Sequence, residues 1–230
     1  MSEAVADHTG VAEPAGRPGV AFDFSRDKQV FPVPWGKAMM WIFLLSDTFI
    51  FSCFLVSYMK VRIATTDPWP STAEVFSLTI YGHSIPLVLI AIMTFILITS
   101  SGTMAMAVNM GYRKDRKKTF WLMVATAALG ASFVGMQAFE WTKLIVDHGV
   151  RPWGNPMGAA QFGSTFFMIT GFHGMHVSAG VIYLLVIAFR VKNGFYERRG
   201  GNYEIVEITG LYWHFVDLVW VFIFAFFYLW

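Results

Sequence analysis

The residues in this 230-residue chain best suited to chemistry are two histidines inside a stretch without Asp, Glu, Lys or Arg. His173 and His176 lie one helical turn apart within the run 162–189, which is long enough to cross a membrane as a helix. Ionisable side chains at that depth are rare, and they usually face other helices rather than lipid. Gly171 and Gly174 lie beside them, and small residues let a neighbouring helix approach closely. We therefore expect this segment to pack against helices that supply polar partners.

Further ionisable groups fall at similar depths in two other apolar segments. Asp47 lies near the middle of the first segment, and His214 and Asp217 lie inside the last one. Glu207 stands at the start of the last segment, and its spacing to His214 and Asp217 places the three side chains on one helix face. We expect that face to contact protein, because charged groups facing lipid are costly.

Three interpretations of this buried polar network are open from the residues alone. In the first, the side chains hydrogen-bond across helices, because buried polar groups in a membrane need partners. In the second, the three histidines bind a metal together with one of the two aspartates, although the Glu-x-x-His pairs of di-iron bundles are absent. In the third, one carboxyl group takes part in proton movement or in binding a lipid head group.

The composition is that of a membrane protein with several spans, since 56% of residues are hydrophobic and 14% are charged. The net charge of +2 is small, and the basic residues lie in loops where they would set membrane orientation, so nothing indicates nucleic acid as a partner. The single cysteine excludes an internal disulfide and a multi-cysteine metal site. The sequence predicts an all-α protein with five transmembrane helices in a bundle, at about 38–59, 85–108, 120–140, 162–189 and 208–230.

The segments ahead of and between these helices predict the topology. Residues 1–36 are polar and rich in proline and glycine, so we expect a flexible cytoplasmic tail that stays on the protein, followed by a membrane domain over 37–230. Thirteen of the 17 Lys and Arg residues fall on the side of the tail, which places the N-terminus in the cytoplasm and the C-terminus outside. His83 and Pro86 are expected to open the second helix. Glu140 is expected to end the third helix at the outer surface, where a carboxylate is hydrated.

Several motifs resemble one known family. Residues 163–167 read GSTFF, residues 170–177 read TGFHGMHV and residues 212–217 read YWHFVD, with weaker matches in QAFEW at 137–141 and in Ser46-Asp47. Together they are similar to the signatures of subunit III of the haem–copper oxidases, in the short five-helix bacterial form. The resemblance covers the chain from Pro34 to Trp230.

The resemblance implies an accessory subunit of an aa3-type cytochrome c oxidase, which is a proton-pumping terminal oxidase of the bacterial inner membrane. The C-terminus of this chain is then expected in the periplasm. Such a subunit is non-catalytic, and the haem and copper lie in partner subunits, so no metal is expected here. It contacts subunit I chiefly, and also subunit II and membrane lipids, and it supports the stability and the proton uptake of subunit I.

The resemblance also implies roles for individual residues. Asp47 takes the place of the family's buried glutamate, with a part in proton uptake, and is one methylene shorter. Arg190, at the predicted cytoplasmic end of the fourth helix, is implied to bind a phospholipid head group together with Asp47. Subunit III of a quinol oxidase and the accessory protein of nitric oxide reductase are close alternatives. A small membrane transporter or a metal-binding membrane protein is a distant one, because broken helices and repeats are not evident.

Overall fold

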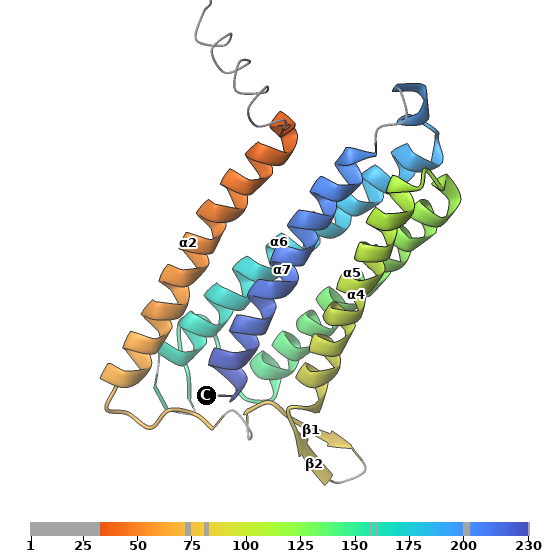
Figure 1. Cartoon of the computed structure of the whole chain (residues 1–230). Coiled ribbons are helices and arrows are strands. Elements are labelled where there is room, and N and C mark those ends of the chain that lie inside the picture. Colours follow the sequence, from red (N-terminus) through yellow and green to blue (C-terminus); the bar gives the residue numbers. More distant parts are fainter. Residues whose placement is uncertain are drawn as a thin grey trace, which may run out of the picture. The chain divides into compact units, whose positions relative to one another are not determined.

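The structure, a computed structural model, describes residues 33–71, 75–80, 83–156, 158–159, 161–199 and 203–229. The predicted flexible tail, residues 1–36, lies outside this part of the chain except for its last four residues. Within the described residues, five helices are long and apolar enough to cross a membrane, which confirms the predicted all-α bundle (Figure 1). They are α2 Trp35–Ala64, α4 Val88–Tyr112, α5 Arg116–Val146, α6 Gln161–Lys192 and α7 Glu204–Phe224, which continues as a π-helical turn over Ala225–Leu229.

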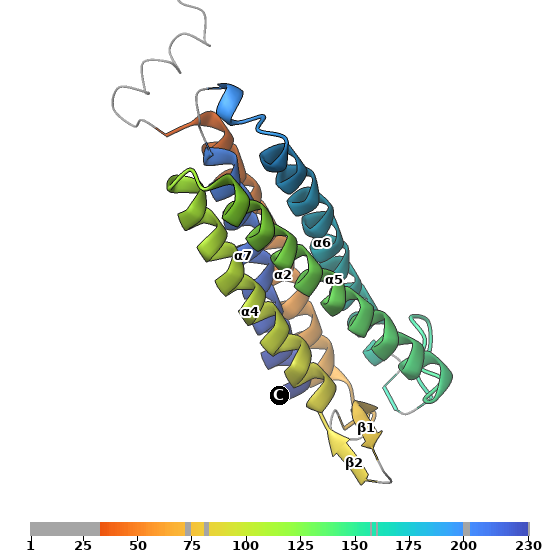
Figure 2. The ribbon, with the colours of Figure 1, turned by 90° about the vertical axis from the view of Figure 1, so that its right-hand side faces the viewer.

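Four of the helices form a closed ring and the fifth stands beside it. The helix α5 packs between α4 and α6, and α7 packs against the same two helices (Figure 2). The helix α2 lies along α6 and α7 and contacts them through side chains. Successive helices run in opposite directions, so the start of α2, the end of α4 and the start of α7 meet at one end of the bundle (Figure 1). We call it the Lys37 end and the other the Trp69 end.

The predicted start of the second span was wrong. His83 and Pro86 lie in a strand, β2 His83–Pro86, which pairs antiparallel with β1 Ser77–Ile80 in a hairpin at the Trp69 end. The helix α4 begins only at Val88, after Leu87 adopts a left-handed φ of 61°. Proline favours an extended conformation for the residue before it, and this preference prevents the helix from starting at Ile85.

The turn between α4 and α5 is tight and capped. Lys114 adopts a positive φ of 58°, and the Asp115 side chain accepts a hydrogen bond of 3.1 Å from the backbone N–H of Lys118. This N–H, the largest cause, and the Lys118 ammonium lower the pKa of the Asp115 carboxyl group, although desolvation opposes them. Because the pKa of Asp115 is lowered in the folded protein, the cap stabilises α5 above the ordinary pKa of aspartate. That contribution is lost as the pH falls through the lowered value.

The centre of the ring is built around Trp213 of α7, whose side chain is fully buried. Its indole Nε1 donates a hydrogen bond of 2.9 Å to Ser100 Oγ of α4. A methyl group on Gly130 of α5 would lie 2.4 Å from the indole ring, and one on Gly180 of α6 would lie 2.9 Å from it. One side chain therefore contacts all three neighbouring helices, and the two glycines leave the room that it occupies.

We predict that Gly130→Ala destabilises the protein, since its methyl group would overlap a buried ring that has no free volume to enter. The expected loss is about 1–3 kcal/mol, the usual range for overpacking a core. Thermal unfolding of the purified protein measures it. The matched control is Gly135→Ala on the same helix, where a methyl group meets nothing within 4 Å. Equal melting temperatures for the two variants would contradict the role given to Gly130.

Candidate functional site

The polar side chains predicted from the sequence fall into separate groups in the structure. The first group joins Asp47 of α2 to His176 of α6, with Asp47 Oδ2 3.0 Å from His176 Nε2. The exposed fractions of the two side chains are 6% and 12%, so the pair is largely shielded from the membrane. The other ring nitrogen, Nδ1, lies 2.8 Å from the carbonyl oxygen of Phe172.

That carbonyl fixes the protonation of the imidazole. A carbonyl oxygen only accepts, so Nδ1 of His176 must carry a proton, and Nε2 then faces the Asp47 carboxyl group. A second proton, on either His176 Nε2 or the Asp47 carboxyl group, allows the imidazole and the carboxyl group to attract each other. The aromatic rings of Phe51 and Phe172 pack against the imidazole, with centroids 5.7 and 4.7 Å away. This apolar surrounding strengthens the electrostatic attraction within the pair.

The second histidine of the motif has different surroundings. His173 is fully buried, with its ring stacked on Trp220 at 5.3 Å between centroids and edge-on to Phe133 at 5.9 Å. Neither ring nitrogen hydrogen-bonds to any part of the chain that the structure describes. Its role in the structure is therefore that of an aromatic core residue.

The polar groups of α7 also lie in two separate places. His214 Nδ1 lies 2.6 Å from Ser101 Oγ of α4, and Asp217 lies buried one turn further along. Glu207 sits apart from them at the Lys37 end, where it pairs with Lys37 of α2 and accepts a hydrogen bond of 2.6 Å from the Tyr112 hydroxyl of α4. The face of α7 that carries Glu207, His214 and Asp217 thus contacts protein. Glu207 forms an ion pair at the start of the helix, and His214 hydrogen-bonds at mid-depth.

The predicted packing glycines and the predicted lipid contact also have definite positions. A methyl group on Gly171 or Gly174 would lie 3.0 Å from Trp141 or from Gln137 of α5, so both glycines face that helix. Arg190 lies exposed near the Lys37 end, with its guanidinium group 5.6 Å from the ring centre of Phe195.

The expectation that Glu140 is hydrated at the surface was wrong. Its helix continues for six more residues to Val146, and Glu140 is only 5% exposed. The hydroxyl of Tyr228, from the π-helical turn that ends α7, lies 3.4 Å from a Glu140 carboxyl oxygen. The apolar residues that follow Glu140 in the sequence could have indicated that the helix does not end there.

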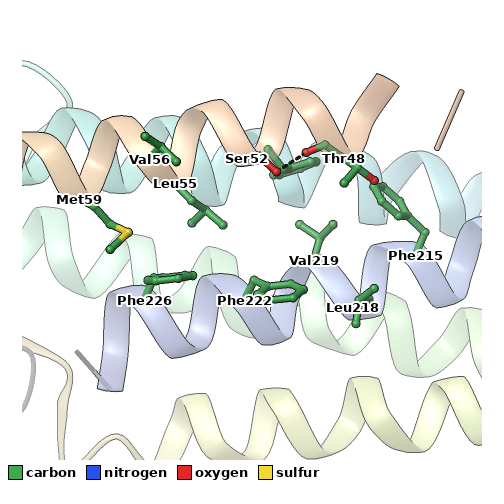
Figure 3. A pocket seen from close by; sticks show the side chains of 11 residues that line it. Thr48, Ser52, Leu55, Val56, Met59, Phe215, Leu218, Val219, Phe222 and Phe226 are labelled. Atoms are coloured by element: carbon green, nitrogen blue, oxygen red, sulfur yellow. Dashed lines mark hydrogen bonds between the residues drawn. The ribbon is translucent and has the colours of Figure 1, made fainter. Parts of the chain in front are cut away.

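A groove that the sequence did not predict runs between α2 and α7. It has a volume of about 300 Å³ and is lined almost entirely by apolar side chains (Figure 3). Thr48 and Ser52 are its hydroxyl-bearing residues, and both donate hydrogen bonds to carbonyl groups of their own helix. The other lining side chains are Phe51, Leu55, Val56, Met59, Phe215, Leu218, Val219, Phe222 and Phe226.

These observations define a class of protein: a five-helix membrane subunit whose mid-depth acid and base groups contact its own helices. Within the described ranges, no group of three or more His, Cys, Asp or Glu side chains is arranged to hold a metal ion. The chain belongs to the cytochrome c oxidase subunit III family, whose pattern matches residues 31–230. It is subunit III of a haem–copper terminal oxidase, and subunit III of this family is non-catalytic.

Two relatives cover most of the chain. Cytochrome c oxidase subunit 3 of Alkalihalophilus pseudofirmus is 32% identical over 192 residues, which is 82% of this chain and 84% of the relative. Probable quinol oxidase subunit 3 of Staphylococcus aureus is 33% identical over 193 residues, which is 82% of this chain and 86% of the relative. Because the two identities are so similar, they support a cytochrome c oxidase and a quinol oxidase equally.

We predict that Asp47 and His176 depend on each other. The variant His176→Leu leaves a buried carboxyl group without its partner, and it should lower the free energy of unfolding by about 3 kcal/mol. The double variant Asp47→Leu/His176→Leu should recover most of that loss, since an apolar pair needs no partner. Thermal unfolding of the single and double variants measures the coupling, with Met175→Leu at an exposed position of α6 as the control. Strictly additive losses would show that the pair contributes no coupling.

Proposed function

We propose that this chain is the accessory subunit III of an aa3-type cytochrome c oxidase in a bacterial inner membrane. In this role it stabilises the catalytic subunit I and supports its proton uptake, and it holds no haem or copper of its own. The observation that carries the proposal is the buried contact of 3.0 Å between Asp47 Oδ2 of α2 and His176 Nε2 of α6, because these two groups can share a proton. A quinol oxidase subunit III is the alternative, since one of the relatives bears that name.

The arrangement of charges supports the proposed orientation. The Lys37 end of the bundle carries the basic turn between α4 and α5 and the basic end of α6, with Arg190 and Lys192. Basic residues collect on the cytoplasmic side of membrane proteins. We therefore place the Lys37 end in the cytoplasm, the side from which an oxidase of this class takes up protons, and the Trp69 end in the periplasm.

Phospholipid binding is the second part of the proposal. The groove between α2 and α7 has satisfied hydroxyl groups and otherwise apolar walls, so an acyl chain fits its chemistry better than a polar ligand does (Figure 3). At the cytoplasmic end, the exposed guanidinium group of Arg190 is suited to a phosphate of a lipid head group.

We predict that Asp47→Asn leaves the complex assembled, since the amide is nearly isosteric, but lowers its endurance. The initial oxygen-consumption rate should match the parent, while the number of turnovers before inactivation should fall several-fold, because the amide cannot exchange a proton with His176. The assay supplies reduced cytochrome c, and a parallel assay with a quinol tests the alternative donor. Asp67→Asn, in an exposed loop, is the same substitution and serves as a control. Equal endurance of all three complexes would reduce Asp47 to a packing role.

A groove variant tests the lipid proposal. Leu55→Trp places an indole in the groove, and the purified complex should then retain less phospholipid, because the indole occupies the volume that an acyl chain would fill. Leu45→Trp, at a position of α2 that is 74% exposed, is the matched control. Phospholipid per complex, measured after solvent extraction, should fall in the first variant only. Equal lipid content in both variants would argue against an acyl chain in the groove.

A further inference from the structure

Asp217 of α7 is a carboxyl group whose hydrogen-bonding capacity is unused. It is 7% exposed, and neither of its oxygens accepts a hydrogen bond of normal geometry from the described residues. It lies about 20 Å along the helix from Glu204, close to the middle of the span. A carboxylate in such a place, with no donor and no countercharge, is costly, so the group must obtain a proton or a donor.

A polar group close to Asp217 is Ser101 at the middle of α4. Its Oγ is 2.6 Å from His214 Nδ1, and Asp217 follows His214 by three residues on the same face of α7, so the carboxyl group lies near this hydroxyl group. A serine hydroxyl has one proton and can accept further hydrogen bonds, so Ser101 can donate to Asp217 or to His214 while accepting from the other. The hydrogen bond between Ser101 and His214 is formed in the structure, and the Asp217 carboxyl group lies next to it without a hydrogen bond of its own to the described residues.

His214 connects this chain of groups to the outer face of the ring. Its imidazole is only partly buried, and its Nε2 forms no hydrogen bond with the described part of the chain. Asp217, by contrast, lies behind it in the interior. The Nε2 edge of His214 is therefore the more accessible end of this series of groups, and the Asp217 carboxyl group is the more buried end.

The other ionisable groups near this interface belong to helices α2 and α6. His173 of α6 stacks on Trp220, one turn beyond Asp217, and Asp47 and His176 are paired with each other. The helix α4 carries no Asp, Glu, His, Lys or Arg, and α5 carries none between Lys118 and Glu140. Of these ionisable side chains in the described helices, His214 is therefore the one that contacts Ser101.

We propose that Asp217, Ser101 and His214 form a proton-exchange site, in which Asp217 holds a proton that enters and leaves through His214 and Ser101. This site is separate from the Asp47–His176 pair and does not depend on the role given to that pair. The proposal applies whether the electron donor of the oxidase is cytochrome c or a quinol.

The proton balance of the exchange is complete within the three groups. A proton arriving at Nε2 of neutral His214 forms the imidazolium, which passes its Nδ1 proton to Ser101 Oγ while the Ser101 proton moves to the Asp217 carboxylate. The products are a neutral imidazole protonated on Nε2, an unchanged serine and a carboxylic acid. Ser101 then donates to Nδ1 where it previously accepted, so the same 2.6 Å contact serves both states. Release follows the reverse steps.

Infrared spectroscopy of the purified oxidase complex tests the site. The carbonyl stretch of a protonated carboxylic acid should be present at neutral pH, should be lost in Asp217→Asn and should shift in Asp217→Glu. On transfer to heavy water, the band of the parent should exchange readily. Ser101→Ala removes the hydroxyl group that joins the two residues, and it should slow that exchange by roughly 100-fold, the scale of a positioned proton-transfer group.

Controls separate proton exchange from altered packing. Thr99→Ala removes an exposed hydroxyl group of α4 that bonds only to the carbonyl of Phe95, and it should leave the exchange rate unchanged. If Asp217→Asn does not assemble, Asp217→Glu keeps an acid at the position and still assigns the band. A band that neither Asp217 variant alters would overturn the proposal. Exchange that is as fast in Ser101→Ala as in Thr99→Ala would overturn it too.

Discussion

The packing of the Trp213 indole determines how the helices α4, α5, α6 and α7 are arranged around it. Trp213 needs a glycine on α5 and a glycine on α6, and it needs a hydroxyl acceptor on α4, so its position sets the rotation of four helices at once. Helices in a membrane gain little from hydrophobic burial against each other, and close packing and hydrogen bonding therefore carry more of the stability. The same indole-to-hydroxyl contact recurs one layer further along, where Trp220 Nε1 donates to Thr94 Oγ1 at 3.0 Å.

The second constraint is the need to satisfy polar groups away from water. The chain meets it locally, because most hydroxyl groups within its spans donate to a carbonyl of their own helix. The ionisable groups are treated differently: they are paired between helices, as in Asp47–His176, or held close to a hydroxyl, as in His214–Ser101. Ionisable groups at mid-depth in a membrane span are rare and usually face protein partners, as these do.

The helix α2 is held to the ring by a small number of contacts spread along its length. Lys37 pairs with Glu207 at one end, Asp47 pairs with His176 at mid-depth, and Tyr58 stacks on Phe227 at 3.9 Å between centroids near the other end. Between the last two contacts, the apolar groove separates α2 from α7. The Asp47–His176 pair and the groove thus lie next to each other along α2, which connects the two parts of the proposed function.

The sequence by itself determined the number of spans, the all-α class, the family and the positions of Asp47, His173 and Asp217 well inside their helices, because length, hydropathy and helical spacing are local along the chain. It did not determine which polar groups meet. That His176 pairs with Asp47 while His173 stacks on Trp220 depends on the rotation of α6 against α2 and α7, which the indole and glycine contacts decide. The β-hairpin before α4 and the burial of Glu140 were also missed. The hairpin depends on the extended conformation around Pro86. The burial of Glu140 depends on Tyr228, which comes from a distant part of the chain, although the apolar residues after Glu140 already indicated a longer helix.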